Sequence, residues 1–258
     1  MRLIIKNNYE SLCEWLASYI IKKIVDFAPD RDKPFVLGLP TGSSPLGVYK
    51  NLINAYKEKR IFFSNIITFN MDEYLGLSPD HPQSYKRFMN DNFFSHIDIK
   101  MENTHVPNGM AADPEAECRS YEEAIKAAGG IELFLGGMGV NGHIAFNEPG
   151  SSLSSRTRVE VLDIKTRESN SRFFGNKIED VPEKALTVGI GTLLDARELL
   201  IIASGSAKAD ALKAAVEGAV DPLCPLSCIQ LHPKAILAMD EDAASKLDSS
   251  TIADSKAG

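Results

Sequence analysis

The segment with the most chemically useful side chains runs from Leu133 to Pro149 and reads LFLGGMGVNGHIAFNEP. An apolar run is followed by glycines at 136, 137, 139 and 142, and then by a histidine and a glutamate. Glycine permits positive φ angles and a close approach of the backbone to a ligand. Because α/β sheets bind ligands beyond the carboxyl ends of their strands, we expect a catalytic loop carrying His143 and Glu148.

His143 is the histidine, among five in the chain, that lies between glycines. With a reference pKa of about 6.5, an imidazole can pass a proton in either direction at neutral pH, and Glu148 can orient the ring or stabilise its charged form. A metal site is the rival interpretation. The loop offers one histidine and one glutamate with no H-x-x-H pattern, so the sequence favours a metal-free acid/base pair.

A further carboxylate, Asp72, follows the predicted strand 66–70 and should reach the same edge of the sheet. A free Asp titrates near pH ~4, so a base that removes a carbon-bound proton would need burial to raise its pKa. Only one of two adjacent strand residues can face the ligand, which favours Asp72 over Glu73. The alternative is a turn whose acids cap the next helix.

The run PFVLGLPTGSSPLGVYKNL reads as a strand, a tight loop and a helix, with Pro45 in the first helical turn. Free amides at a helix N-terminus, together with hydroxyl groups, suit a phosphate. The loop matches neither the Walker nor the dinucleotide pattern, so nucleotides are disfavoured, although an ordinary serine-capped helix is the alternative. The predicted phosphate ligands here are Thr41, Gly42, Ser43 and Ser44.

A second strand, Gly-Ser turn and helix occur in LLIIASGSAKADALKAA. This turn places Lys208 in the first turn of a helix, where a cation is unfavourable unless an anion is bound. We therefore expect both loops to surround one phosphate. No G-x-S-x-G nucleophile motif is present, so proton transfer on a sugar phosphate fits the chain better than acyl transfer.

Short apolar runs alternate with amphipathic stretches, which indicates a three-layer, doubly wound α/β fold with a mostly parallel sheet, similar to a Rossmann fold but without its dinucleotide fingerprint. We expect one domain over residues 1–258, a helical lid at 160–182 and a flexible tail at 241–258. A solvated connecting helix with no role in binding is the alternative for 160–182. The expected strands are 2–5, 35–39, 66–70, 133–136, 185–188, 198–203 and 235–239. The expected helices are 9–27, 45–58, 84–94, 114–128, 192–196 and 207–217.

The formal charge of −7 and the pI near 5.3 argue against nucleic-acid or anionic-membrane binding. The chain has no apolar stretch of transmembrane length and no secretory leader, so we predict a cytoplasmic protein. Its four cysteines are scattered and predict no disulfide framework. The pair Cys224 and Cys228 lacks a matching half-site for zinc, so we expect ordinary thiols there.

Taken together, these motifs resemble those of the glucosamine-6-phosphate deaminases over nearly the whole chain. The resemblance is carried by GLPTGSSP, FNMDEYLGL, HPQSY, GGMGVNGHIAFNEPGSS, SRTR, NSRFF, ALTVGIGTLLDA, GSAKA and AAVEGAV. Members of this family convert glucosamine 6-phosphate and water into fructose 6-phosphate and ammonia without an obligatory metal or organic cofactor. The resemblance therefore implies no cofactor and a sugar phosphate as substrate.

The resemblance also implies roles for single residues. Asp72 would move a proton between C2 and C1 of the substrate, and His143, supported by Glu148, would open the sugar ring. Arg172, within the predicted lid, would bind a substrate oxygen, and Lys208 would hold the phosphate with the loop at 41–44. Gly137 is included among the predicted ligand-binding positions.

Two positions depart from the family pattern. Many members have Asp where this chain has Asn141, and an amide can hold the imidazole without stabilising its charge. Some relatives are hexamers activated by N-acetylglucosamine 6-phosphate, which binds between subunits at positions matching Ser151, Arg158 and the two residues after Val159. Ser151, Ser152 and Arg158 are present here. However, Glu160 and Val161 replace the Lys and Thr of those relatives. A carboxylate repels a phosphate, so we predict weak or absent activation.

Two other functions stay open at this point. One is a weakly active sugar-phosphate-binding regulator, which Asn141 alone supports. The other is a neighbouring enzyme such as a 6-phosphogluconolactonase or a pentose-phosphate isomerase. The pair NMDEY and NGHIAFNEP favours the deaminase. A homo-oligomer, with a hexamer as one form, is expected from the resemblance.

Overall fold

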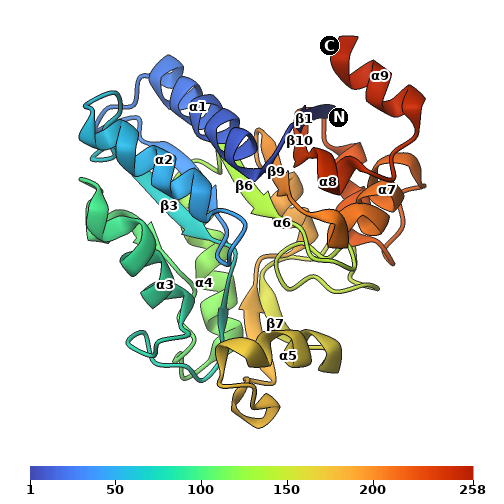
Figure 1. Ribbon diagram of the computed structural model, residues 1–258. Helices are drawn as coiled ribbons and strands as arrows, with labels where there is room; N and C mark the ends of the chain where they lie inside the picture. The colour runs from blue at the N-terminus through green and yellow to red at the C-terminus, as the bar shows by residue number, and fades with distance from the viewer. Residues whose placement is uncertain (258) are drawn as a thin grey trace.

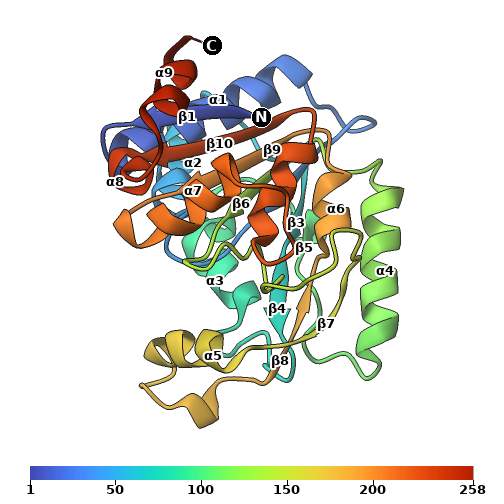
Figure 2. The ribbon, with the colours of Figure 1, turned by 90° about the vertical axis from the view of Figure 1, so that its right-hand side faces the viewer.

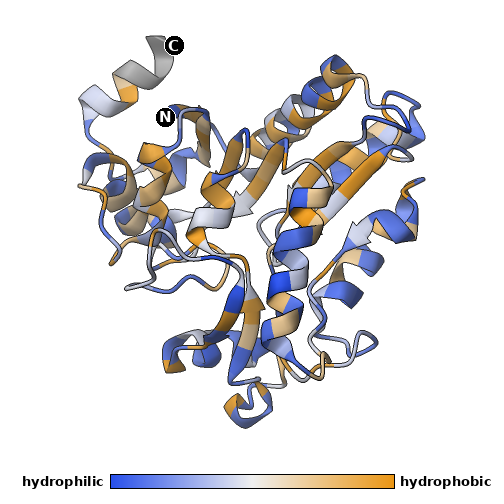
Figure 3. Cartoon of the chain, turned by 180° about the vertical axis from the view of Figure 1, so that it is seen from behind, coloured by the Kyte–Doolittle hydropathy of each residue, from blue (hydrophilic) through white to orange (hydrophobic). Residues whose placement is uncertain are grey.

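Hydrophobic side chains alternate between the two faces of a seven-stranded sheet and build a core on each side. In strand β2 (Phe35–Leu39), Leu37 and Leu39 enter one core, whereas Val36 enters the other. Strands covered on both faces read as continuous apolar runs, which explains why they were recognisable in the sequence. Figure 3 shows these strands as mostly hydrophobic and the outer helix faces as hydrophilic.

The computed structural model describes residues 1–257, and Figure 1 shows their arrangement. The central sheet has the order β1-β10-β9-β6-β2-β3-β5, and each neighbouring pair is parallel. The predicted α/β fold with a mostly parallel sheet is therefore confirmed. The other strands of this sheet are β1 (Arg2–Lys6), β3 (Ile66–Asn70), β5 (Thr104–His105), β6 (Leu133–Gly137), β9 (Leu199–Ala203) and β10 (Ala235–Asp240).

Helices cover both faces of the sheet. One core contains side chains of α1 (Tyr9–Phe27), α2 (Leu46–Lys57) and α3 (Tyr85–Asn92). The opposite core contains side chains of α4 (Pro114–Ala127), α6 (Ile190–Leu194), α7 (Ala209–Glu217) and α8 (Glu241–Ala244). Within the described residues, none of the helices combines the length and apolar character needed to cross a bilayer.

One predicted strand does not belong to the parallel sheet. Strand β8 (Lys184–Thr187) lies between β4 (Asp72–Tyr74) and β7 (Arg158–Val161) in a separate antiparallel sheet, which Figure 2 shows below the central one. This sheet packs on a core of its own, which is why β8 is apolar without being central. That core consists of Tyr74, Phe146, Leu162, Phe174, Val181 and Ala185.

The predicted lid at 160–182 contains α5 (Ile164–Asn170) and the short 3₁₀ helices η3 (Ser171–Phe173) and η4 (Ile178–Asp180). The segment predicted as a flexible tail contains α8 and α9 (Ser249–Ala257), joined by residues 245–248. Ala243, Ala244 and Leu247 are buried in the main core, and this burial orders the segment. Residue 258 lies outside the described residues.

Candidate active site

The predicted site residues follow neighbouring strands at one edge of the sheet. β6 pairs with β2 on one side and with β9 on the other, and β3 pairs with β2. Gly136 shows how close two of the following segments lie: a Cβ added there would be 3.5 Å from Met71 Cε and 3.4 Å from Ile144 Cδ1. The residue before Asp72 and the residue after His143 therefore pack on the same glycine.

Asp72 is the first residue of β4 and is only 7% exposed. Its register partner in β8 is Thr187, whose hydroxyl oxygen accepts a hydrogen bond from the Phe146 amide at 3.1 Å. Burial, and to a smaller degree the charge of Glu73, raises the pKa of Asp72 from its ordinary 3.8 to about 8. A carboxyl with such a pKa can both accept and return a proton near neutral pH.

Glu73 has the capping role that the sequence offered as an alternative. Its carboxylate accepts hydrogen bonds from the Ser84 hydroxyl at 2.7 Å and from the amides of Tyr85 and Lys86 at 3.0 Å each. These donors lie at the N-terminus of α3, where orphan amides require acceptors. The expectation that the two adjacent acids differ in role is thus consistent with the geometry.

His143 reaches Glu148 through an amide. Nδ1 of His143 lies 2.7 Å from Oδ1 of Asn141, and Nδ2 of Asn141 donates to Oε2 of Glu148 at 3.0 Å. The direct distance from Nδ1 to that carboxylate oxygen is 3.8 Å. An amide oxygen can only accept, so Nδ1 carries the hydrogen and Nε2 keeps its lone pair for a substrate. Burial and the charge of Lys208 lower the pKa of His143 below its ordinary value, although the charge of Glu148 opposes this shift.

The loop around His143 depends on two glycines for different reasons. A Cβ at Gly139 would lie 2.1 Å from Cε1 of His143, so the imidazole rests directly on the glycine. Of the four loop glycines expected to permit positive φ, only Gly142 has such an angle, at +82°. Ala145 has φ +52°, a conformation that costs free energy in a non-glycine residue and is found mostly at functional sites.

The two predicted phosphate loops meet. Nζ of Lys208 donates to Oγ of Ser44 at 3.0 Å, and Gly42, with φ +91°, leaves open space above the loop. Burial lowers the pKa of Lys208, and the charge of Asp240 opposes this shift. A pocket of about 520 Å³ lies between the loops. It is lined by Tyr9, Ser43, Ser44, Leu46, Gly47, Lys50, Ser204 and Lys208.

Five of these eight lining residues were not predicted from the sequence, and Leu46 and Gly47 among them directly follow the predicted loop. Ser204 stands immediately before the Gly-Ser turn and could have been included with it. Lys50 is an exposed cation one turn into α2, which an i+4 reading of that helix face could have indicated. Tyr9 carried no local signal, because it lies 34 residues from Ser43 in the sequence.

Arg172 is not in contact with the other predicted site residues in the described chain. It is exposed on η3, where its guanidinium packs 4.7 Å from the ring centroid of Phe173. The preceding helix α5 nevertheless touches the site, because the Thr166 hydroxyl donates to Oε1 of Glu148. Gly137, at the end of β6, has no neighbouring atom within 4 Å of a Cβ position and faces open space.

Two of the three residues predicted as an effector site, Ser151 and Arg158, are bonded to each other. Arg158 donates to Asn147 Oδ1 at 2.8 Å and to Ser151 Oγ at 3.3 Å, and it also forms an ion pair with Glu160. Ser152 contacts Ser154 at 3.1 Å instead. The Arg158 charge is therefore already paired within the chain.

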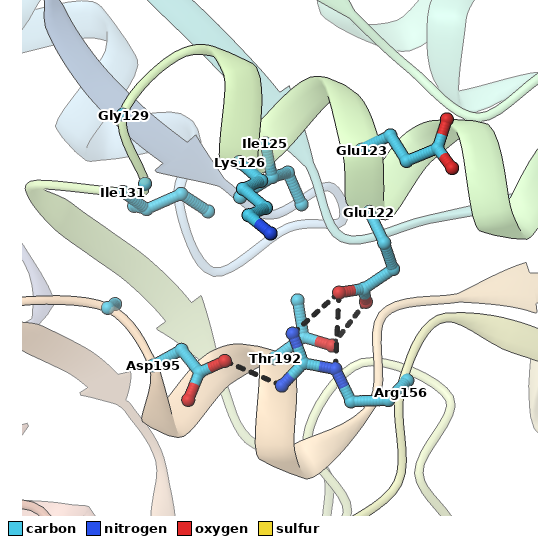
Figure 4. Close-up of a pocket in the computed structure, with 11 residues that line it drawn as sticks. Glu122, Glu123, Ile125, Lys126, Gly129, Ile131, Arg156, Thr192 and Asp195 are labelled. Atoms are coloured by element: carbon cyan, nitrogen blue, oxygen red, sulfur yellow. Dashed lines mark hydrogen bonds and ion pairs between the residues drawn. The ribbon is translucent and has the colours of Figure 1, made fainter.

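A second cavity of about 420 Å³ lies between α4 and α6, away from the predicted site (Figure 4). Arg156 binds Glu122 and Asp195 there, each at 2.6 Å, and the Glu122 carboxylate also accepts from Thr157 and Thr192. These bonds lower the pKa of Glu122 against the opposing effect of burial. They fasten the segment after Glu148 to two helices, which is a structural role.

All four cysteines are free, as the sequence predicts. In the part of the chain that the structure describes, no three His, Cys, Asp or Glu side chains gather in a way that could hold a metal ion.

A buried carboxyl, an imidazole and a basic loop pair at one edge of a parallel sheet are typical of α/β enzymes that transfer protons on anionic substrates. Residues 7–237 match the family model of glucosamine-6-phosphate isomerases/6-phosphogluconolactonase, and the chain belongs to this family.

Individual relatives agree with this family. The chain is 59% identical to a glucosamine-6-phosphate deaminase of Parabacteroides distasonis, over 96% of this chain and 92% of the relative. It is 56% identical to one of Treponema denticola, over 98% and 93%. A solved structure of a monomeric glucosamine-6-phosphate deaminase superposes with a TM-score of 0.91 at 42% identity, over 95% and 99% of the two chains. A 6-phosphogluconolactonase from Trypanosoma cruzi shares the fold alone, with a TM-score of 0.74 at 18% identity over 95% and 96%.

Proposed function

We propose that this chain converts glucosamine 6-phosphate and water into fructose 6-phosphate and ammonia. The observation that carries the proposal is the placement of a buried Asp72, with a pKa of about 8, beside the loop of His143, whose own pKa is lowered by burial and by the charge of Lys208 in the predicted phosphate cradle. The 59% and 56% identical relatives named as deaminases support it.

The first step opens the sugar ring. Nε2 of His143 accepts the proton of the O1 hydroxyl and delivers it to the ring oxygen O5 as the C1–O5 bond breaks, which yields the open-chain aldehyde. The hydrogen bond from Nδ1 to Asn141 holds the tautomer that this transfer requires, and Glu148 holds the amide in turn. The chain thus stabilises the transient imidazolium through a relay rather than through direct contact with a carboxylate.

The second step moves a proton along the carbon chain. The ionised Asp72 removes the proton from C2 while the C1 oxygen takes up a proton from the substrate's ammonium group, giving an enediol-type intermediate that bears an amino group at C2. Asp72 then returns its proton to C1, leaving a protonated imine at C2. Water adds to that carbon and ammonia leaves, so that fructose 6-phosphate remains. A carboxyl whose pKa lies near the working pH suits a group that must take and return the same proton.

The substrate phosphate is held by Lys208 and the loop formed by Thr41, Gly42, Ser43 and Ser44. Arg172 has to approach from the segment 160–182 when substrate binds, which makes this segment a lid. The contact between Thr166 and Glu148 couples that lid to the acid/base group.

A lactonase is the principal rival, because 6-phosphogluconolactonases share the fold. Lactone hydrolysis removes no carbon-bound proton, so it does not require a buried carboxylate base such as Asp72. The test is one coupled assay for ammonia and ketose phosphate, run beside hydrolysis of 6-phosphogluconolactone. Ammonia release supports the proposal, whereas lactone hydrolysis alone, or neither reaction, contradicts it.

The assembly and location are proposals as well. We propose a homo-oligomer, although the similar solved structure is described as monomeric. Light scattering of the purified chain distinguishes the two states. We also propose a cytoplasmic location, because a doubly charged sugar phosphate does not cross a lipid bilayer unaided.

A further inference from the structure

The hydroxyl group of Tyr9 is bonded to the start of helix α2. It accepts a hydrogen bond from the amide of Gly47 at 2.9 Å. It donates toward the carbonyl oxygens of Ser44, at 3.0 Å, and Ser43, at 3.2 Å. Tyr9 is the first residue of α1, so one hydroxyl links the beginnings of two helices that are distant in the sequence.

Position 47 is shaped to admit this hydroxyl. A Cβ at Gly47 would lie 2.6 Å from Sγ of Cys13 and 3.0 Å from Oη of Tyr9. A residue with a side chain at this position would push the start of α1 away from the loop. Burial raises the pKa of Tyr9 to about 12, so its hydroxyl stays protonated and can donate and accept at the same time.

Ser44 is consequently fixed on two sides. Its side-chain oxygen accepts from Nζ of Lys208, and its carbonyl oxygen accepts from Tyr9. Both partners line the pocket between the two predicted phosphate loops. Binding groups held in place before the ligand arrives give higher affinity, because less ordering is required on binding.

We propose that Tyr9 is a positioning residue that holds the 43–47 loop in the conformation that binds the substrate phosphate. The inference rests on the proposed function, since it takes the ligand of this loop to be a sugar phosphate. The Tyr9 hydroxyl forms hydrogen bonds with the backbone of the 43–47 loop and not with the proposed proton-transfer groups, so its loss should weaken binding more than it slows the chemical steps.

The test compares Tyr9→Phe with Tyr19→Phe. Both substitutions remove one hydrogen-bonded hydroxyl from α1, but the Tyr19 hydroxyl donates to Glu198, away from the loops. For Tyr9→Phe we expect KM for glucosamine 6-phosphate to rise about fivefold with kcat changed less than about twofold, the effect of one lost neutral hydrogen bond. Tyr19→Phe should leave both constants unchanged. Thermal unfolding of both variants compares the stability that each substitution costs.

Calorimetric titration with inorganic phosphate separates this inference from the proposed function, because it requires no turnover. We expect Tyr9→Phe to bind phosphate about fivefold more weakly than the wild type and Tyr19→Phe to bind it equally well. Equal phosphate affinities in all three proteins, or a Tyr9→Phe variant that loses kcat at unchanged KM, would overturn the role of Tyr9. A wild-type protein that binds phosphate but releases no ammonia would overturn only the proposed reaction.

Discussion

The imidazole Nδ1 of His143 lies 2.7 Å from the amide oxygen of Asn141, and the amide nitrogen of the same side chain reaches Glu148 at 3.0 Å. An asparagine therefore separates the imidazole from the carboxylate while bonding to both. An aspartate in its place would bring two carboxylates to within hydrogen-bond distance of each other, which favours uptake of a proton.

The substitution Asn141→Asp tests this relay. A carboxylate beside Nδ1 stabilises the imidazolium, so we expect His143 to titrate about one pH unit higher than in the wild type. The measurement is an NMR titration of the His143 ring protons. Asn141→Ala is the control, because it removes the bridge without adding charge and should not raise the pKa. An unchanged or lower pKa in Asn141→Asp would contradict the relay.

The substitution Asp72→Asn should abolish turnover and stabilise the fold. We expect at least a 1000-fold loss of kcat with substrate still bound, the usual scale for an essential proton carrier. The wild-type carboxyl has an ordinary pKa of 3.8 and a folded pKa of about 8. As pH rises from 4 to 8 the unfolded state ionises first, so wild-type stability falls across this window.

Asparagine does not ionise, so the variant avoids this loss. We expect its free energy of unfolding at pH 8 to exceed that of the wild type by at least about 1 kcal/mol, with no such gain at pH 4. Urea denaturation at both pH values measures the difference. Retained turnover would exclude Asp72 as the base, and a variant less stable than the wild type at pH 8 would contradict its desolvation.

The pH dependence of kcat/KM should reflect the same carboxyl. Only ionised Asp72 can accept the C2 proton, so kcat/KM should rise with pH up to about 8. In Glu73→Gln the rising limb should move to lower pH, because the charge of Glu73 raises the pKa of Asp72. This variant should also melt at lower temperature, since Glu73 caps α3. A rising limb at the same pH in Glu73→Gln and the wild type would show that the charge of Glu73 does not affect the pKa of Asp72.

Lys208→Met should impair binding more than catalysis. Loss of a charge-assisted contact to phosphate should raise KM by about 100-fold, with a smaller fall in kcat. Lys213→Met is the matched control within α7, the helix that begins directly after Lys208; Lys213 pairs with Glu217 and Asp248 on the surface. Steady-state kinetics of both variants provide the measurement, and an equal effect of the two would contradict the phosphate cradle.

N-acetylglucosamine 6-phosphate should activate this enzyme weakly or not at all, because Arg158 is already paired with Glu160. The check is the initial rate at subsaturating substrate with and without the effector. Glu160→Lys should release Arg158 and restore a basic surface, so any response should be larger in this variant. A large fall in the half-saturation concentration of the wild type would show the prediction to be wrong.

Much of the fold could be predicted because strands buried on both faces are short apolar runs, as in β2 and β9, and because amphipathic stretches between them form helices, as in α1 and α4. The order of polar groups after each strand then placed Asp72, His143 and Lys208 at one edge. These are local properties of the chain, so sequence alone determined them.

Only the tertiary structure showed that Glu73 is buried as well as Asp72 and that its carboxylate caps the start of α3. It also assigned β8 to a second sheet, because pairing with β4 and β7 depends on contacts between segments far apart in the chain. The hydrogen bond from the Tyr9 hydroxyl to the predicted phosphate loop also joins segments that are far apart in the chain. The periodicity of apolar residues indicates which face of a helix or strand is buried. Which segment packs on that face depends on contacts across the whole chain.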